Sequence, residues 1–106
     1  MNEIEIEPQA LRQMIEGKEA VFMLDCREPW EFETASIEGS EVMLMHSVPH
    51  RMAEIPRNCG VVVICHSGRR SLEVALWLRG QGLAAKSLSG GIDRWAREID
   101  RQVPRY

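Results

Sequence analysis

Two short runs of consecutive apolar residues constrain the fold of this chain more than any other feature. Residues 21–24 (Val-Phe-Met-Leu) and 61–64 (Val-Val-Val-Ile) are apolar throughout, whereas a strand with one face in water alternates apolar and polar residues. Continuous apolar runs of this length are typical of strands in a parallel sheet that is covered on both faces. The pattern predicts an α/β fold: a small central parallel β-sheet flanked by helices on both faces.

The rest of the chain alternates strand-like and helix-like segments. An edge strand is predicted at 3–6, where Glu and Ile alternate, and further strands are predicted at 42–45 and 84–88. Helices are predicted at 8–17, 28–32, 47–54, 69–79 and 92–99, from apolar spacing and from Pro and Gly near their ends. Because apolar residues cover much of the segment 69–79, we expect that helix to be packed on more than one side. Residues 1–106 are expected to form a single domain, with the tryptophans and methionines in its core.

Charge and composition narrow the class of function. The net charge of −3 disfavours a nucleic-acid binder. No apolar run approaches the roughly 18 residues that span a bilayer, and the acidic N-terminus is unlike a signal peptide. We therefore expect a cytoplasmic protein without a membrane partner. Cys26, Cys59 and Cys65 lack framework spacing and are expected to be reduced thiols. His46 and His50 are expected to be an exposed pair, and no metal or cofactor is expected.

The segment Cys65-His66-Ser67-Gly68-Arg69-Arg70 carries the clearest functional signal. It follows the predicted strand 61–64 and opens a predicted helix, and ligands of parallel sheets bind beyond the carboxyl ends of the strands. Backbone N–H groups and the helix dipole favour the thiolate form of a cysteine at such a position. We expect Cys65 to be the nucleophile. The expected binding loop for a small anion is made of His66, Ser67, Gly68, Arg69, Arg70 and Ser71.

Asp25 and Arg27 follow the other buried run, so we expect them to border the same pocket. Arg27 has an alternative role, an ion pair with an acid such as Glu31 that holds the strand end. Arg70 also has two roles open to it: a contact with the substrate, or a pair with a carboxylate such as Glu73 or Asp25.

Cys26 is expected to be a packing residue, with redox coupling to Cys65 as the less favoured alternative. Cys59, which precedes a turn, is expected to have no role.

Three segments resemble the signatures of the rhodanese-like sulfurtransferase family. They are residues 24–32 (LDCREPWEF), 63–71 (VICHSGRRS) and 88–95 (LSGGIDRW), in the family's order and over most of the chain. The tail Val103-Pro104-Arg105-Tyr106 also resembles that of single-domain rhodaneses. One departure is Ala35-Ser36-Ile37, where family members often carry Gly-His-Ile.

The resemblance implies that Cys65 takes a sulfane sulfur from a donor and passes it on as a persulfide. The loop from Cys65 to Arg70 has six residues, as in the sulfur-transferring members, whereas related phosphatases have a loop one residue longer. The arginines favour a small anionic donor such as thiosulfate, and the implied acceptor is cyanide or a thiol. Alternatives are a persulfide carrier that delivers sulfur to a protein partner and, less favoured, a phosphatase or arsenate reductase. The intact Cys65 loop speaks against a non-catalytic interaction domain.

Overall fold

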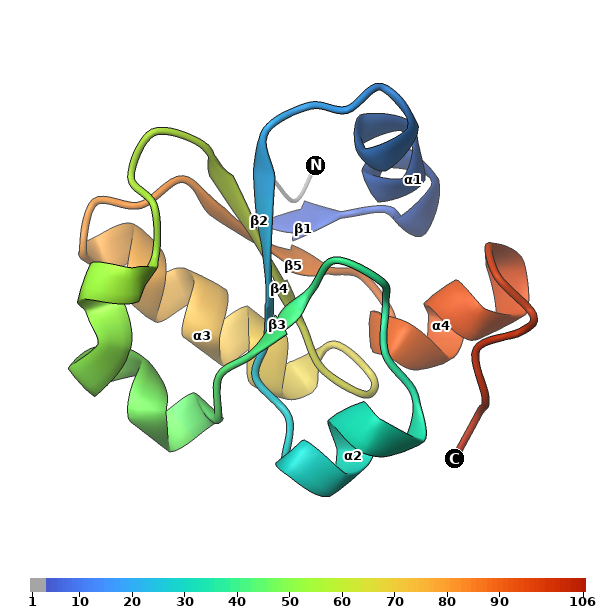
Figure 1. The fold of residues 1–106 in the computed structure, drawn as a ribbon. Helices are drawn as coiled ribbons and strands as arrows, with labels where there is room; N and C mark the ends of the chain where they lie inside the picture. The colour runs from blue at the N-terminus through green and yellow to red at the C-terminus, as the bar shows by residue number, and fades with distance from the viewer. Residues whose placement is uncertain (1–3) are drawn as a thin grey trace.

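The computed structural model describes residues 4–106, which form a five-stranded sheet with helices on both faces (Figure 1). The strand order is β1-β5-β4-β2-β3, and every pair of neighbouring strands is parallel. The strands are β1 Glu5–Ile6, β2 Val21–Asp25, β3 Glu41–Val42, β4 Gly60–Ile64 and β5 Ala85–Leu88. The predicted α/β fold and the edge position of the first strand are confirmed; Glu3, where that strand was predicted to begin, lies outside the described residues.

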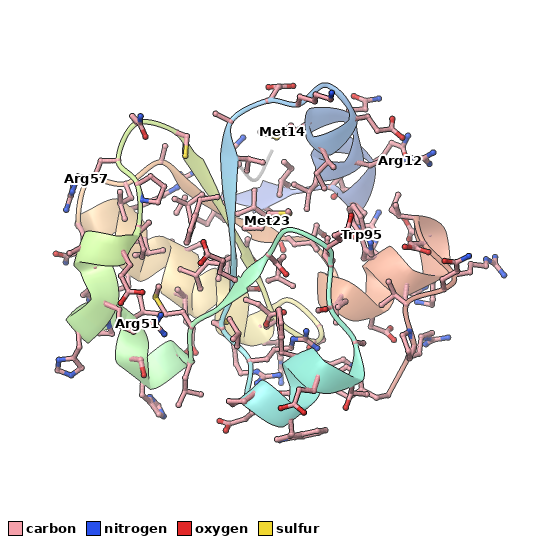
Figure 2. The ribbon with its side chains drawn as sticks, viewed as in Figure 1. Arg12, Met14, Met23, Arg51, Arg57 and Trp95 are labelled. Atoms are coloured by element: carbon pink, nitrogen blue, oxygen red, sulfur yellow. The ribbon has the colours of Figure 1, made fainter. Side chains whose placement is uncertain are left out.

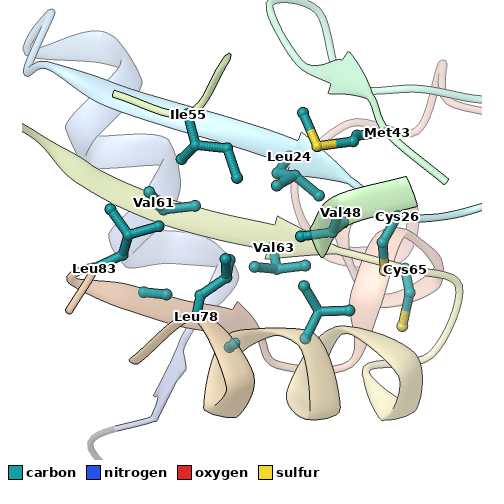
Figure 3. Close-up of a cluster of buried hydrophobic side chains, with 13 residues drawn as sticks. Leu24, Cys26, Met43, Val48, Ile55, Val61, Val63, Cys65, Leu78 and Leu83 are labelled. Carbon is teal, nitrogen blue, oxygen red and sulfur yellow. The ribbon is translucent and has the colours of Figure 1, made fainter. Parts of the chain in front are cut away.

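The sheet separates the buried core into two clusters, one on each of its faces. The helices that cover these faces are α1 Pro8–Glu16, α2 Pro29–Thr34, α3 Arg69–Gly80 and α4 Gly91–Glu98, with a 3₁₀ segment η1 at Met45–Glu54. Side chains alternate across β4: Val61 and Val63 pack in the cluster that faces α3 and η1, shown in Figure 3. Val62 and Ile64 pack in the opposite cluster. Trp95 of α4 lies in that second cluster together with Met23 of β2 (Figure 2).

Two expectations about apolar residues are wrong. The outer face of α3 is open, with Leu76 55% and Trp77 39% exposed, because α3 packs against one face of the sheet. Trp30, at the start of α2, is 61% exposed and is therefore not a core residue.

Two predicted elements differ in detail. The predicted strand 42–45 ends at Val42, and the segment after it is a 3₁₀ helix interrupted by a kink at Arg51. Pro49 lies inside η1 and has no N–H to donate to a regular helix. No helix within residues 4–106 has both the length and the apolar character needed to cross a membrane.

Candidate active site

Cys65 lies where the central strand β4 ends and the loop to α3 begins. Its side chain is buried, and the backbone N–H of Gly68 donates to its Sγ atom at 3.1 Å. Gly68 has a φ of 100°, which a glycine adopts without strain. A Cβ atom at this position would also lie 3.2 Å from the backbone nitrogen of Gly90. The loop therefore curls so that the Gly68 N–H, at the start of α3, points at the Cys65 sulfur. The sequence predicted backbone N–H donors from this loop, and Gly68 provides one of them.

Two buried serines extend the polar surroundings of the thiol. The Sγ atom of Cys65 lies 3.2 Å from the Oγ atom of Ser71, which lies 2.7 Å from the Oγ atom of Ser87. Both serines are fully buried, one on the first turn of α3 and the other on β5. Because a hydroxyl can donate or accept, Ser71 can accept from the neutral thiol and donate to the thiolate. Ser71 was predicted as a loop residue, whereas Ser87 has no distinguishing signal in the sequence.

The start of α4 supports the loop from the other side. The backbone N–H of Ile92 donates to the carbonyl oxygen of Cys65 at 2.8 Å, and that of Asp93 donates to the carbonyl of His66 at 3.1 Å. Gly91 has a φ of 63°, and a Cβ atom there would lie 2.5 Å from the Cys65 carbonyl oxygen. The segment 88–95 is thus adjacent to the Cys65 loop, and only glycine fits at the point of contact.

Arg70 forms an ion pair with Glu31 of α2. Its two terminal nitrogens donate to the two carboxylate oxygens at 2.9 and 3.0 Å. These bonds from Arg70, followed by the bond from the Glu28 N–H that completes the capping box of α2, lower the pKa of Glu31 to about 2. Of the two roles open to Arg70, pairing with a carboxylate is therefore the one observed, and its partner is Glu31 rather than Glu73 or Asp25.

Asp25 and Arg27 form a second ion pair, and both side chains are fully buried. Arg27 donates to the Asp25 carboxylate from Nε at 2.8 Å and from a terminal nitrogen at 2.6 Å, and that nitrogen also donates to the Ala35 carbonyl. These contacts fit the alternative role of Arg27, an ion pair that holds the end of the strand. The acid in that ion pair is Asp25 rather than Glu31. Arg27 reaches Glu31 only through its main-chain carbonyl, at 3.3 Å.

Tyr106 joins the two ion pairs, and sequence reasoning did not identify it. Its hydroxyl donates to Glu31 at 2.9 Å and accepts from Arg27 at 2.6 Å. Its ring stacks on His66, with centroids 4.5 Å apart, and meets Trp30 edge to face. The end of the chain runs back toward α2 to make these contacts (Figure 1). The resemblance of the tail to single-domain rhodaneses was the one available signal.

The outer side of the loop carries Ser67 and Arg69, which are both exposed. The Arg69 side chain has no hydrogen bond or ion pair with any residue of the described range 4–106. His66 is half-buried, and its Nε2 atom is enclosed without a hydrogen-bond partner in that same range. The Arg69 guanidinium is thus exposed to solvent, whereas the Arg70 guanidinium is paired with the Glu31 carboxylate.

Cys26 is buried beside the site, in the same apolar cluster as Cys65 (Figure 3). Burial, followed by the proximity of Cys65, raises the pKa of the Cys26 thiol to about 12. Cys59 is half-buried, and all three cysteines are free thiols. No group of His, Cys, Asp and Glu in the described part of the chain is arranged to hold a metal ion.

Comparisons with known proteins agree with the fold. The profile of the rhodanese-like domain matches residues 7–98. A protein of Allochromatium vinosum named sulfurtransferase is 38% identical over 94 residues, which cover 88% of each chain. A putative sulfur carrier protein of Bacillus subtilis is 37% identical over 78 residues, which cover 74% of this chain and 42% of that protein.

A solved structure has the same fold. The crystal structure of a rhodanese-related protein from Thermoplasma volcanium superimposes with a TM-score of 0.82 at 29% identity, over 90% of this chain and 92% of that one. The predicted signatures, the parallel sheet and the family match therefore lead to one conclusion: this chain belongs to the rhodanese-like domain family, whose members include sulfurtransferases.

Proposed function

We propose that this protein is a sulfurtransferase that moves a sulfane sulfur from thiosulfate or a persulfide donor to cyanide or a thiol. The thiolate of Cys65 attacks the sulfane sulfur of the donor, and the bond between the two donor sulfurs breaks. With thiosulfate, sulfite leaves with the electron pair of that bond. The acceptor then attacks the outer sulfur of the Cys65 persulfide, and the Cys65 thiolate is the leaving group.

The observation that carries the proposal is the environment of the Cys65 sulfur. It accepts the N–H of Gly68 at the start of α3 and lies beside the hydroxyl of Ser71. Donors that are already oriented stabilise negative charge without reorganising during the reaction. A thiolate and a terminal persulfide are both anions, so the same donors serve both states.

Arg69 is the group that we propose for binding an anionic donor. The Arg70 guanidinium is already in an ion pair with the Glu31 carboxylate, whereas the Arg69 side chain is exposed beside the loop. A guanidinium binds sulfonate oxygens through charge-assisted hydrogen bonds. The position of Arg69 therefore supports a thiosulfate-like donor over a neutral one.

The test is the mass of the intact protein before and after incubation with thiosulfate. We expect a gain of one sulfur atom, its loss on addition of cyanide with formation of thiocyanate, and no gain in Cys65→Ser. Cys59→Ser is the matched control and should gain sulfur as the unmodified protein does. Absence of any gain with thiosulfate and with a small organic persulfide would refute the proposal.

A persulfide carrier that serves a protein acceptor is the second candidate. It is supported by the similarity to the putative sulfur carrier protein of Bacillus subtilis. The chemistry at Cys65 is the same in both cases, so the rate with small acceptors separates them. Fast transfer from thiosulfate to cyanide favours the free-standing enzyme, and a persulfide that forms but discharges slowly to cyanide favours the carrier.

A further inference from the structure

Cys26 and Cys65 directly follow the neighbouring parallel strands β2 and β4. In the parallel ladder of β2 and β4, Leu24 lies opposite Val63 and Asp25 lies opposite Ile64. The Cys26 N–H donates to the Ile64 carbonyl at 3.0 Å, which completes the Asp25–Ile64 pair, so Cys26 and Cys65 are the next residues along the chain after the last pair. Neighbouring strands are about 4.8 Å apart, which lies within the Cα separation of about 4.4–6.8 Å that a disulfide spans.

The two side chains also lie on the same face of the sheet. Both belong to the apolar cluster under α3, and Figure 3 shows them together at the end of that cluster. The Cys26 thiol has no task in the transfer described above. A second thiol therefore lies in the same buried cluster as the sulfur that we propose to carry the persulfide, close enough for Cys65 to raise its pKa.

We propose that Cys26 is an internal acceptor that discharges the Cys65 persulfide as hydrogen sulfide and leaves a Cys26–Cys65 disulfide. This inference rests on the proposed persulfide chemistry. It adds an activity, sulfide release, that requires no external acceptor. An external thiol then reduces the disulfide and restores both cysteines.

The step balances without an added oxidant. The Cys26 sulfur attacks the Sγ atom of Cys65, a new bond forms between the two cysteine sulfurs, and the bond from Sγ to the outer sulfur breaks. The outer sulfur leaves with the electron pair of that bond and is reduced to sulfide, while Cys26 is oxidised to the disulfide level. The proton of the Cys26 thiol goes to the outer sulfur, so the anionic Cys65 persulfide releases hydrosulfide, which water protonates in part to hydrogen sulfide.

The surroundings of Cys26 make this reaction slow compared with transfer to a good external acceptor. Burial, the charge of Cys65 and the charge of Asp25 raise the pKa of Cys26, and Arg70 opposes them. Because the thiolate is the attacking species, only a small fraction of Cys26 is reactive at neutral pH. The Cys65 persulfide therefore persists long enough to meet an external acceptor, and it discharges internally when none arrives.

The experiment follows sulfur on the full chain after thiosulfate and small thiols have been removed. The reduced protein is loaded, desalted and incubated, and free sulfide and intact mass are recorded over time. We expect sulfide release together with a fall in mass from one sulfur above the reduced protein to two hydrogens below it. In Cys26→Ser the added sulfur should remain, with sulfide release at least about tenfold slower.

Cys26→Ala is the second variant, because a buried serine hydroxyl can destabilise the core, and Cys59→Ser is the control that should release sulfide as the unmodified protein does. Oxidation of the unloaded protein with diamide should link Cys26 to Cys65, as read by peptide mapping. Failure to form that link, or equal persulfide lifetimes in the unmodified protein and both Cys26 variants, would overturn the inference and leave the proposed function intact. Failure to load sulfur on Cys65 from thiosulfate or a small organic persulfide would overturn both.

Discussion

Replacing Glu31 by Gln should remove a pH-dependent contribution to stability that the structure allows us to estimate. The pKa of Glu31 is lowered from 4.5 to about 2, chiefly by its two bonds from Arg70. One pKa unit corresponds to about 1.4 kcal/mol, so the ionised carboxylate contributes about 3 kcal/mol to the free energy of unfolding at neutral pH. Because the Arg70 side chain is 37% exposed and salt screens it, we expect a measured loss of about 2 kcal/mol in Glu31→Gln.

The sign of the pH dependence follows from the direction of the shift. The folded state binds the Glu31 proton more weakly than the unfolded state, so the stabilisation is fully present above the unfolded pKa of about 4.5. It is lost progressively as the pH falls toward about 2. The difference in stability between the unmodified protein and Glu31→Gln should therefore be largest at neutral pH and shrink in acid.

The assay is urea denaturation of the unmodified protein and Glu31→Gln across this pH range. Glu33→Gln, an exposed position on the same helix, is the matched control and should change stability by less than about 0.5 kcal/mol. A loss in Glu31→Gln that is the same at about pH 3 as at about pH 7 would refute the reasoning, because the missing stability would then not come from the ionised carboxylate.

Three further predictions test the surroundings of Cys65. Gly91→Ala should lower the free energy of unfolding by at least about 2 kcal/mol in thermal denaturation, because the added Cβ would clash with the Cys65 carbonyl and the φ of 63° disfavours alanine. Gly80→Ala is the control, because a Cβ at that position would meet no atom within 4 Å. Arg69→Met should raise KM for thiosulfate roughly tenfold without changing Tm, and an unchanged KM would exclude Arg69 from donor binding. Tyr106→Phe should lose about 1–2 kcal/mol in urea denaturation, because two hydrogen bonds of its hydroxyl are removed; an unchanged stability would show that the hydroxyl does not link the two ion pairs.

Local sequence patterns were sufficient for the order of the strands and helices and for the position of the Cys65 loop. The apolar runs at 21–24 and 61–64 became the neighbouring strands β2 and β4. Cys65 could be placed at the start of a helix because a glycine and a helix-forming segment follow it within a few residues. Helix packing was less predictable: the apolar outer face of α3 is exposed, since composition does not say how many layers cover a helix.

The sequence by itself determined a parallel α/β sheet with a cysteine loop at its carboxyl edge, because strand periodicity, glycine turns and helix starts are encoded within a few neighbouring residues. Only the tertiary structure decided which charges meet. Arg70 pairs with Glu31 across 39 positions of the chain, and Tyr106 reaches Glu31 across 75. The placement of Cys26 and Cys65 in one buried cluster likewise depends on the register of β2 and β4. Such contacts depend on how distant elements pack, and no local pattern of residues specifies that packing.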